Sequence, residues 1–387
     1  MDVVRRVLVA GGGVGGLAAA LAFAQRGAQV RLIERRPAFD VTGVGLGQPA
    51  NALRVYDHLG VLEEILDHGF IYDHMTIFDA QRRLIAEHKF LLGDERVPAV
   101  CALSRAELHR ILLAAAKRIG VEVSLGLQIS AYDESDANVV RVRFSDGTND
   151  AFDLVAGFDG IRSTTRQHLV GTMFVPRPCG IGAWRVQVDR PECVTGMEFL
   201  QGCGGKAGAM PISKDKMYLF NIRPEPIGAY YERKDLASLW KERLAQFGSY
   251  VSEVSASLNE QSDIVYGALE PMLVPWPWHR GRVAIGGDAA HIVPPHLTQG
   301  AAMAVEDALI LAHEVMQADG TLEQRLMRYG RARYARCAFV YAFARSWLEE
   351  EQAVLTAEQM EEARRELAQN ASGRIAVSDR ILNTPIL

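Results

Sequence analysis

The sequence predicts an α/β fold, in which a glycine-motif (Rossmann-like) domain receives an inserted β-rich domain and is followed by C-terminal helices. Residues 5–34, "RRVLVAGGGVGGLAAALAFAQRGAQVRLIE", have the pattern of a buried strand, a tight turn, a helix and a second strand. Between about 176 and 272, short alternating strands such as "AWRVQV" and "KMYLFNI" lie among prolines and glycines. "RGRVAIGGDAAHIVPP" then returns to a buried strand, and helical patterns occupy 299–318, 322–348 and 356–370.

The order of these segments predicts how the domains are arranged. A chain of 387 residues is long enough for two or three domains. Residues 1–175 and 273–345 are expected to form the glycine-motif domain, in two parts. The inserted sheet is expected over 176–272. A short segment near 72–100, within the first part of the glycine-motif domain, is expected to extend into this inserted domain. Residues 346–387 are expected to form a C-terminal helical region.

Composition and charge exclude several classes of protein. The net charge of −5 favours neither nucleic acid nor an acidic membrane as a partner. No apolar run approaches the roughly 18 residues that a membrane span needs. The five cysteines form no CxxC pair and no metal-ligand spacing with histidine, and free thiols are typical of a reducing cytosol. We therefore expect a cytoplasmic monomer or homodimer without a metal site.

The glycine run predicts a dinucleotide site. Gly11, Gly13 and Gly16 form G-x-G-x-x-G between the first strand and the helix, and Glu34 follows 18 residues after Gly16. Such glycines make the turn, admit a pyrophosphate and let the helix pack on the strand, while the acid accepts hydrogen bonds from a ribose. The alternative is a glycine-rich structural turn, and the motif alone does not distinguish NAD from FAD.

Two acid–glycine pairs follow later strands. "DLVAGFDGIRSTTR" ends a strand at Asp159, and "RVAIGGDAAHIVPP" ends another at Gly287 and Asp288. Each pair alone is typical of a turn. Because ligands of open α/β sheets bind at the carboxyl ends of the strands, the two pairs together with the glycine motif predict one shared site.

With these motifs the chain resembles the single-component FAD-dependent aromatic hydroxylases, which have the para-hydroxybenzoate hydroxylase fold. It is most similar to the salicylate, 3-hydroxybenzoate and 6-hydroxynicotinate monooxygenases. The resemblance covers about 1–345 and rests on the glycine motif with Glu34, on "DGIRSTTR", on "GRVAIGGDAAH" and on "PPHLTQGAAMAVEDA". It is weak through 176–272, the region that selects the substrate in this family.

The resemblance implies noncovalent FAD and assigns its contacts. Arg36 is placed near the adenosine, with an exposed surface charge as the alternative. Arg105 is placed near the ribityl–phosphate link, or else simply begins a helix, and Asp288 is expected to hold a ribityl hydroxyl. Asp159 is expected to serve both FAD and the docking of NAD(P)H. The full set of expected FAD contacts is Gly11, Gly13, Val14, Gly15, Gly16, Glu34, Arg35, Arg36, Gly47, Gln48, Arg105, Leu127, Asp159, Gly287, Asp288, Gln299, Gly300 and Ala301.

The segment "PPHLTQGAAMAVEDA" is expected to carry the chemistry. Pro294 and Pro295 end the strand, and a helix beginning at Gln299 would direct its N–H groups at the pyrimidine edge of the flavin. A helix N-terminus stabilises negative charge there. His296 either contacts the substrate or holds the loop, and His291 is expected to be structural. The predicted catalytic residues are His296, Tyr218 and Pro295.

The substrate pocket is predicted on strands of the inserted sheet, from Trp184, Met210, Tyr218 and Phe220. Tyr218 could orient or deprotonate a hydroxylated ring, although ordinary core alternation explains these side chains equally well. "TGVGLGQPANALRVYDHLG" resembles the family's stretch beside the flavin ring. Ala50 stands where the family has a proline, and Gly47 where the 6-hydroxynicotinate branch has a histidine, so that exact substrate is in doubt.

The predicted activity is hydroxylation of a small hydroxylated aromatic or N-heteroaromatic ring. The resemblance implies NAD(P)H as a transient co-substrate and O₂, acting through a C4a-hydroperoxyflavin. FAD-dependent oxidation of a non-phenolic substrate, such as a urate-like molecule or a polycyclic antibiotic, would use the same fold and motifs. A flavin-binding protein without hydroxylation and a nicotinamide-dependent dehydrogenase are the two competing hypotheses from different functional classes.

Overall fold

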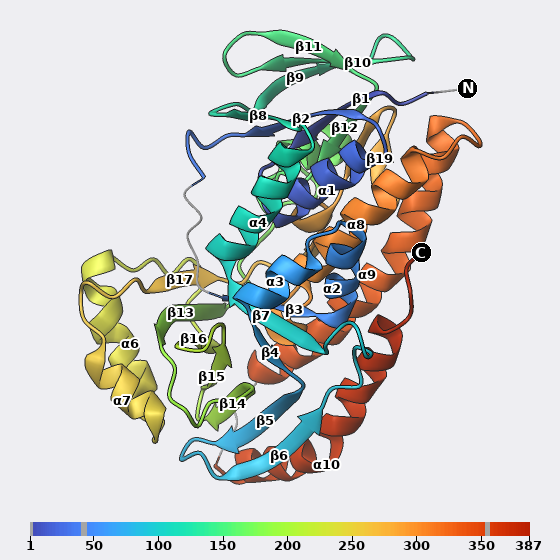
Figure 1. Ribbon diagram of the computed structural model, residues 1–387. Helices are drawn as coiled ribbons and strands as arrows, with labels where there is room; N and C mark the ends of the chain where they lie inside the picture. Colours follow the sequence, from blue (N-terminus) through green and yellow to red (C-terminus); the bar gives the residue numbers. More distant parts are fainter. Residues whose placement is uncertain (1–2, 40–44, 353–356) are drawn as a thin grey trace.

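A six-stranded sheet carries the glycine motif in the computed structural model, which describes residues 3–39, 45–352 and 357–387 (Figure 1). Its strand order is β19-β20-β12-β1-β2-β8, and every neighbouring pair is parallel except β19 with β20. The strands are β1 (Arg6–Ala10), β2 (Gln29–Glu34), β8 (Glu122–Leu125), β12 (Leu154–Gly157), β19 (His279–Arg280) and β20 (Val283–Ile285).

Both faces of this sheet are covered, because its strands are apolar on both sides. Val7 and Val9 face a core shared with helices α1 (Val14–Gln25), α4 (Arg105–Arg118) and α8 (Gly300–Val315). Leu8 faces a separate core beneath a small antiparallel sheet. That sheet consists of β9 (Ile129–Asp133), β10 (Val140–Phe144) and β11 (Asn149–Phe152).

A larger, mostly antiparallel sheet forms the second layer, in the order β17-β13-β16-β15-β14-β5-β6. Helices α6 (Leu236–Leu244) and α7 (Tyr250–Ser257) cover one face, seen at the lower left of Figure 1. Its strands are β5 (His74–Asp79), β6 (Leu84–Lys89), β13 (Ile181–Asp189), β14 (Met197–Gly202), β15 (Gly205–Pro211), β16 (Lys216–Pro224) and β17 (Val265–Ala268). The chain near 72–100 thus contributes β5 and β6 to the sheet built from 181–268.

Short elements join the two layers. A three-stranded sheet, β3-β7-β4, and a two-stranded ribbon, β18-β21, complete the strand pairing. These elements and the intervening helices are β3 (Gly45–Pro49), α2 (Ala50–His58), α3 (Leu62–His68), β4 (Phe70–Tyr72), β7 (Val100–Ser104), α5 (Thr164–Val170), β18 (Met272–Leu273), β21 (His291–Ile292) and the 3₁₀ turns η1 (Arg233–Asp235), η2 (Gly287–Ala289) and η3 (Pro295–Leu297).

Two long helices close the chain, α9 (Leu322–Gln352) and α10 (Ala357–Leu382). α10 packs against β6 and runs below it in Figure 1. The C-terminal region expected to begin at 346 starts within a helix, because α9 continues through this position. Among the described residues, no helix combines the length and the apolar character needed to cross a membrane.

Two further details differ from the sequence prediction. The helical pattern at 51–68 is interrupted at Gly60, whose φ of +71° ends α2 before α3 begins. A glycine at a left-handed position ends a helix at little steric cost, which the apolar spacing alone does not reveal. The second helix over the large sheet, α7, was not predicted.

Candidate active site

The turn after β1 has the geometry of a pyrophosphate site. A Cβ at Gly11 (φ +110°) would lie 2.3 Å from the Phe158 carbonyl oxygen, and one at Gly16 would lie 1.9 Å from the Gly11 carbonyl oxygen. A Cβ at Gly13 would meet no protein atom within 4 Å, so its outer side is open. Because α1 begins at Val14, this open space lies at a helix N-terminus, where N–H groups stabilise an anion.

The glycine turn opens into a cleft of about 300 Å³, here called the glycine cleft. The structure brings many of the expected FAD contacts together on its walls. These are Gly11, Gly13, Val14, Glu34, Arg35, Arg36, Arg105, Leu127, Asp159 and Asp288. The donor set fits a dinucleotide, with helix N–H groups and arginines for phosphates and carboxylates for hydroxyls. Gly15, Gly16, Gly47, Gln48, Gly287, Gln299, Gly300 and Ala301 do not line this cleft.

Glu34 also stabilises the turn itself. Its Oε2 accepts a hydrogen bond from the Gly12 N–H at 2.9 Å, and its Oε1 accepts one from the Arg36 N–H at 3.0 Å. The carboxylate therefore connects the end of β2 to the glycine loop while it faces the cleft.

His109 and Phe39 line the cleft but were not predicted. The His109 Nε2 lies 2.8 Å from the Gly12 carbonyl oxygen, and its ring lies 4.7 Å from the Phe39 ring, centroid to centroid. Burial lowers the pKa of His109, which favours the neutral ring donating from Nε2. His109 follows Arg105 by one helical turn on α4, and this i,i+4 spacing was the available signal.

Asp159 faces the cleft, but its carboxylate is engaged by α5. It accepts hydrogen bonds from the Thr165 N–H at 2.9 Å, from the Thr165 hydroxyl at 3.0 Å and from Ser163. The buried Arg166 connects the two acid–glycine motifs, donating to the carbonyl oxygens of Ile161 (2.8 Å) and Ala289 (3.3 Å). This region therefore holds the strand ends together, which gives "DGIRSTTR" a structural role beside any contact with FAD or NAD(P)H.

Asp288 is placed differently, with its side chain turned into the cleft at the end of β20. The side chain is exposed on the cleft side, and desolvation by the protein atoms packed near it raises its pKa. The positive charges of His291, Arg105 and Arg166 oppose the rise. Among the described residues no side-chain hydrogen bond to Asp288 is formed, so its oxygens are available to a ligand hydroxyl.

The loop before α8 forms a second region. After η3, Thr298 has a left-handed φ of +57°, and α8 begins at Gly300, where a Cβ would meet no protein atom within 4 Å. Gln299 and Asn51 pair through their side-chain amides, with Asn51 Nδ2 donating to Gln299 Oε1 at 3.0 Å. A Cβ at Gly47 would lie 3.0 Å from the Thr298 Cγ2, so β3 passes directly beside this loop.

A second cavity lies beside this loop and is here called the His296 cavity. Its walls come from the large sheet, from the His296 loop and from α9 and α10. They are formed by Pro49, Tyr72, Met75, Ile77, Phe90, Leu92, Val100, Met197, Phe199, Gln201, Lys206, His296, Leu297, Thr298, Gln299, Trp347, Ile375, Ser378, Asp379 and Leu382. A mostly apolar concave site with a few polar groups is typical of a small-molecule pocket.

The predicted substrate residues divide between the two faces of the sheet. Met210, Tyr218 and Phe220 share the face that carries Phe199, although they do not line the His296 cavity. Trp184 was wrongly assigned to the pocket. Its side chain is fully buried on the opposite face, against Trp240 and Tyr266 beneath α6 and α7, because successive residues of a strand point to opposite faces.

Tyr218 has the environment of a hydrogen-bond acceptor rather than of a base. Its hydroxyl accepts a hydrogen bond from the Arg185 Nε at 3.1 Å. Burial raises the pKa of Tyr218, and the Arg185 charge only partly opposes this. The predicted role in deprotonating a ring is therefore not favoured by the geometry.

Pro295 and Gln48 lie outside the lining of both cavities, and residues 42–44 of the stretch beside β3 lie outside the described residues.

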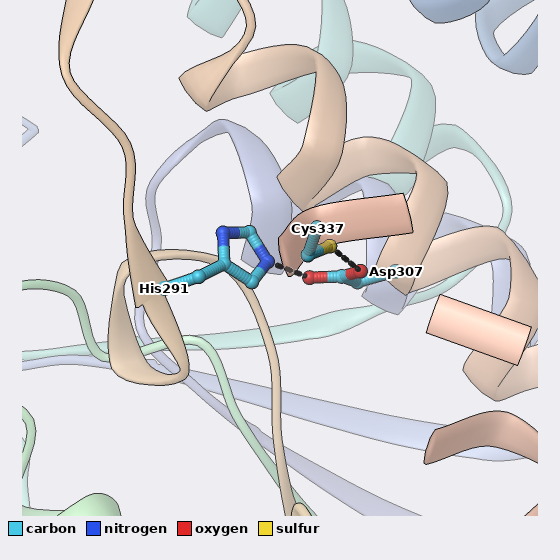
Figure 2. A group of neighbouring side chains, drawn as sticks. All are labelled: His291, Asp307 and Cys337. Carbon is cyan, nitrogen blue, oxygen red and sulfur yellow. Dashed lines mark hydrogen bonds and ion pairs between the residues drawn. The ribbon is translucent and has the colours of Figure 1, made fainter. Parts of the chain in front are cut away.

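A buried polar network lies behind the cleft, where Figure 2 shows His291 directed at Asp307 with Cys337 beside it. Asp307 accepts hydrogen bonds from His291 Nε2 (2.6 Å), from Arg333 Nε (2.7 Å) and from the Gly287 N–H (2.8 Å). These donors already occupy the carboxylate, and the Arg333 charge opposes a cation. We therefore interpret the cluster as a structural connection between the Gly287 turn and α8 and α9, in keeping with the structural role expected of His291.

The glycine turn, Glu34 and Asp288 define a dinucleotide-binding protein of the α/β class. The chain belongs to the FAD binding domain family, which it matches over residues 5–344. It is 35% identical to YetM of Bacillus subtilis (strain 168), a protein assigned provisionally as an FAD-dependent monooxygenase, over 86% of this chain and 90% of that one. It is 30% identical to the 6-hydroxynicotinate 3-monooxygenase of Pseudomonas fluorescens, over 79% and 81%.

A solved structure supports the same conclusion. HpxO of Klebsiella pneumoniae, determined with FAD and uric acid, superposes with a TM-score of 0.87 at 26% identity, covering 99% of this chain and 98% of that one. The resemblance to flavoprotein hydroxylases is thereby confirmed at the level of the family. The protein is an FAD-dependent monooxygenase, for which NAD(P)H and O₂ are the typical co-substrates.

Replacement of Asp288 by alanine is expected to weaken FAD binding. A buried hydroxyl would lose a charged acceptor, which costs about 1.5–3 kcal/mol, or roughly 10- to 100-fold in the dissociation constant. Titration of apoprotein with FAD, followed by flavin fluorescence, measures the change. Asp263→Ala is the control, since its side chain is 80% exposed. Equal dissociation constants for Asp288→Ala and wild type would remove Asp288 from the site.

Proposed function

We propose that this monooxygenase hydroxylates a small hydroxylated aromatic or N-heteroaromatic ring in the His296 cavity. The observation that carries the proposal is the composition of that cavity beside the start of α8. Phe90, Phe199 and Trp347 line it together with aliphatic side chains, while polar groups are few. Such walls suit a flat apolar ring whose orientation is set by a small number of hydrogen bonds.

The chain's own residues would divide the work between the two cavities. The N-terminus of α1 behind Gly13 would hold the diphosphate, Glu34 the ribose hydroxyls and Asp288 a ribityl hydroxyl. FAD, when bound, supplies hydride acceptance and activation of O₂. The N-terminus of α8 at Gly300 would stabilise negative charge at the flavin pyrimidine edge, because its N–H groups lack helical partners. The large sheet, with β5 and β6, would be the substrate domain.

Apolar walls would also exclude water from the reacting ring. His296, Thr298 and Gln299 are the polar residues that the loop before α8 contributes to the cavity. Gln299 is held by Asn51, so its side chain is fixed before a substrate arrives. We propose that His296 positions the ring, with holding of the loop as the alternative role.

A second candidate function is oxidation of a non-phenolic, urate-like substrate or a polycyclic one. Its support is the similarity to HpxO, whose structure contains uric acid. The polar side chains of Gln201 and Lys206 on the cavity wall would suit a ring with several carbonyl groups.

A substrate screen distinguishes the candidates. Hydroxylated benzoates, hydroxypyridines, uric acid and a polycyclic phenol would each be tested for stimulated NAD(P)H consumption, O₂ uptake and product. We expect product from the hydroxylated single rings. If uric acid alone gives product, the second candidate is correct. If H₂O₂ equals the NAD(P)H consumed with every compound, hydroxylation of these rings is excluded.

His296→Ala is expected to uncouple the reaction while FAD remains bound, because the dinucleotide contacts lie in the other cavity. Misplacing a reacting atom by about 1 Å can cost on the order of a hundredfold, so the fraction of O₂ recovered in product should fall and H₂O₂ should rise. The ratio of product to NAD(P)H consumed measures this. His58→Ala is the control, since His58 is exposed and hydrogen-bonds only within α2. Unchanged coupling in His296→Ala would assign the residue to holding the loop.

A further inference from the structure

The C-terminal helix contributes an acid to the His296 cavity. Asp379 lies near the end of α10 and is 2% exposed, and it lines the cavity together with Ile375 and Leu382. These residues follow the region matched by the FAD binding domain family, which ends at 344. The acid therefore belongs to a part of the chain that the family comparison leaves unassigned.

Only one oxygen of this carboxylate is used by the protein. Asp379 Oδ2 accepts a hydrogen bond from the Leu91 N–H at 2.8 Å, and His88 Nε2 lies 3.3 Å from the same oxygen. No described residue hydrogen-bonds the other oxygen, Oδ1. Because Asp379 lines the cavity, this second oxygen is an acceptor that a ligand donor in the cavity can use.

The surroundings hold Asp379 in one position. His88 and Leu91 belong to β6 and the residues after it, and α10 packs on that strand. The His88 ring in turn meets the edge of Phe90, another cavity residue, at 5.7 Å between centroids. Both anchors donate to Oδ2, so the carboxylate can turn only by losing them.

We propose that Asp379 is a specificity-determining residue, whose Oδ1 accepts a hydrogen bond from an N–H or O–H group of the substrate. This rests on the proposed function, since it assumes a ring in the His296 cavity. The loop bearing His296 and Gln299 forms one wall, and α10 with β6 forms another. The substrate class that fits is a ring with a donor, such as a ring N–H or a hydroxyl, on the side that faces α10.

The same geometry selects against other substituents. Burial raises the pKa of the Asp379 carboxyl, and the hydrogen bonds from Leu91 and His88 only partly offset this rise. A further hydrogen bond donated to Oδ1 by the substrate would therefore stabilise the charged carboxylate. A carboxylate or an ether oxygen facing Oδ1 would instead leave two acceptors in contact. The charged or titratable residues on the other walls are Tyr72, Lys206 and His296.

Paired probes test the proposal on the FAD-loaded protein. The pairs are 2-pyridone with N-methyl-2-pyridone and hydroquinone with 4-methoxyphenol, which differ by one donor within each pair. Dissociation constants come from the perturbation of flavin absorbance, without turnover. Wild type should prefer the donor member of at least one pair by about 10- to 100-fold, the range expected for a hydrogen bond to a charged group.

Asp379→Asn should abolish this preference or reverse it. The amide oxygen can still accept from Leu91 while the amide N–H₂ replaces the acceptor in the cavity, so the helix contact survives. The thermal unfolding temperature and the FAD affinity should stay unchanged. If Asp379 only stabilised the fold, a changed ligand preference would be accompanied by a change in one of these two quantities. Asp73→Asn is the control, because Asp73 pairs with Lys89 on the outside of the same hairpin.

Each remaining outcome decides the matter. Equal affinities within both pairs in wild type, a preference retained in Asp379→Asn, or no binding of any probe would overturn the proposal. Product analysis with the same probes separates the role of Asp379 in binding from the proposed hydroxylation. A donor preference that depends on Asp379, without hydroxylated product, would sustain the acid's role and contradict the proposed function.

Discussion

Gly13→Val is expected to give a folded protein that purifies without bound FAD. Gly13 has φ −76°, which valine adopts, and its Cβ would meet no protein atom within 4 Å. The branched side chain would instead occupy the open space where the diphosphate approaches the N-terminus of α1. Loss of two charge-assisted hydrogen bonds costs about 3–6 kcal/mol, or two to four orders of magnitude in the dissociation constant.

The measurement combines flavin absorbance with thermal unfolding of the apoprotein. Gly373→Val is a matched control, because a Cβ at this exposed position on α10 also meets no protein atom within 4 Å. The control should retain the yellow cofactor. Gly16→Val, by contrast, should fail to fold, since its Cβ would lie 1.9 Å from the Gly11 carbonyl oxygen. Full flavin absorbance in Gly13→Val would show that the diphosphate does not bind at this turn.

Asp307→Asn is expected to lower the free energy of unfolding by about 3–5 kcal/mol, because it leaves the buried His291 without its ion-pair partner, while Arg333 keeps Glu306 at 2.6 Å. The side chains of Asp307, His291 and Arg333 are at most 1% exposed. Chemical denaturation at saturating FAD measures the loss. The control is Asp319→Asn, whose side chain is 76% exposed beside Arg328 and should change stability by less than about 1 kcal/mol.

The pH dependence of this difference follows from the two pKa shifts. Burial alone would raise the pKa of Asp307, but the charges of His291 and Arg333 outweigh it and lower the pKa from 3.8 to about 2. The stabilisation from Asp307 is therefore present above pH 3.8 and is lost as the pH falls towards 2. Burial alone would lower the pKa of His291, but Cys337 and Asp307 raise it well above 6.5.

The contribution of His291 to the free energy of unfolding is consequently complete below pH 6.5. It is lost as the pH rises through the pKa of His291 in the folded protein. Wild type and Asp307→Asn should differ most between about pH 4 and 6.5. A constant difference from pH 3 to pH 9 would contradict the assignment of charges in this network.

Much of the candidate FAD site could be predicted from the sequence, because its residues follow strand ends in order. Gly11, Glu34, Asp159 and Asp288 each stand at the end of a parallel strand or within three residues after it, and parallel strands of one sheet end at the same edge. Their meeting in the glycine cleft therefore needs only local patterns and one rule of sheet topology. His109 was missed although its spacing from Arg105 was visible.

The substrate cavity could not be predicted in the same way. Strand alternation assigns Trp184 and Tyr218 to opposite faces only when the register between their strands is known. Trp184 pairs with Asn221 and Gln187 pairs with Tyr218. Because paired residues share a face and successive residues alternate, Trp184 and Tyr218 point to opposite sides of the sheet. Which face meets the flavin loop depends on α6 and α7 covering the other one. Pairings of this kind join residues far apart in the chain, so no local pattern reveals them.

The sequence by itself determined the glycine turn, the strand–turn–helix–strand order of residues 5–34, and the positions of the acids near the sheet edge, because each depends on residues close together in the chain. Only the tertiary structure decided that His88 and Leu91 hold Asp379, which follows them by 291 and 288 positions, in the wall of the His296 cavity. It likewise decided that Asp307 of α8 accepts from both His291 and Arg333. The physical reason is that a buried polar group needs a hydrogen-bond partner, and the residues close enough to be that partner depend on how the whole fold packs.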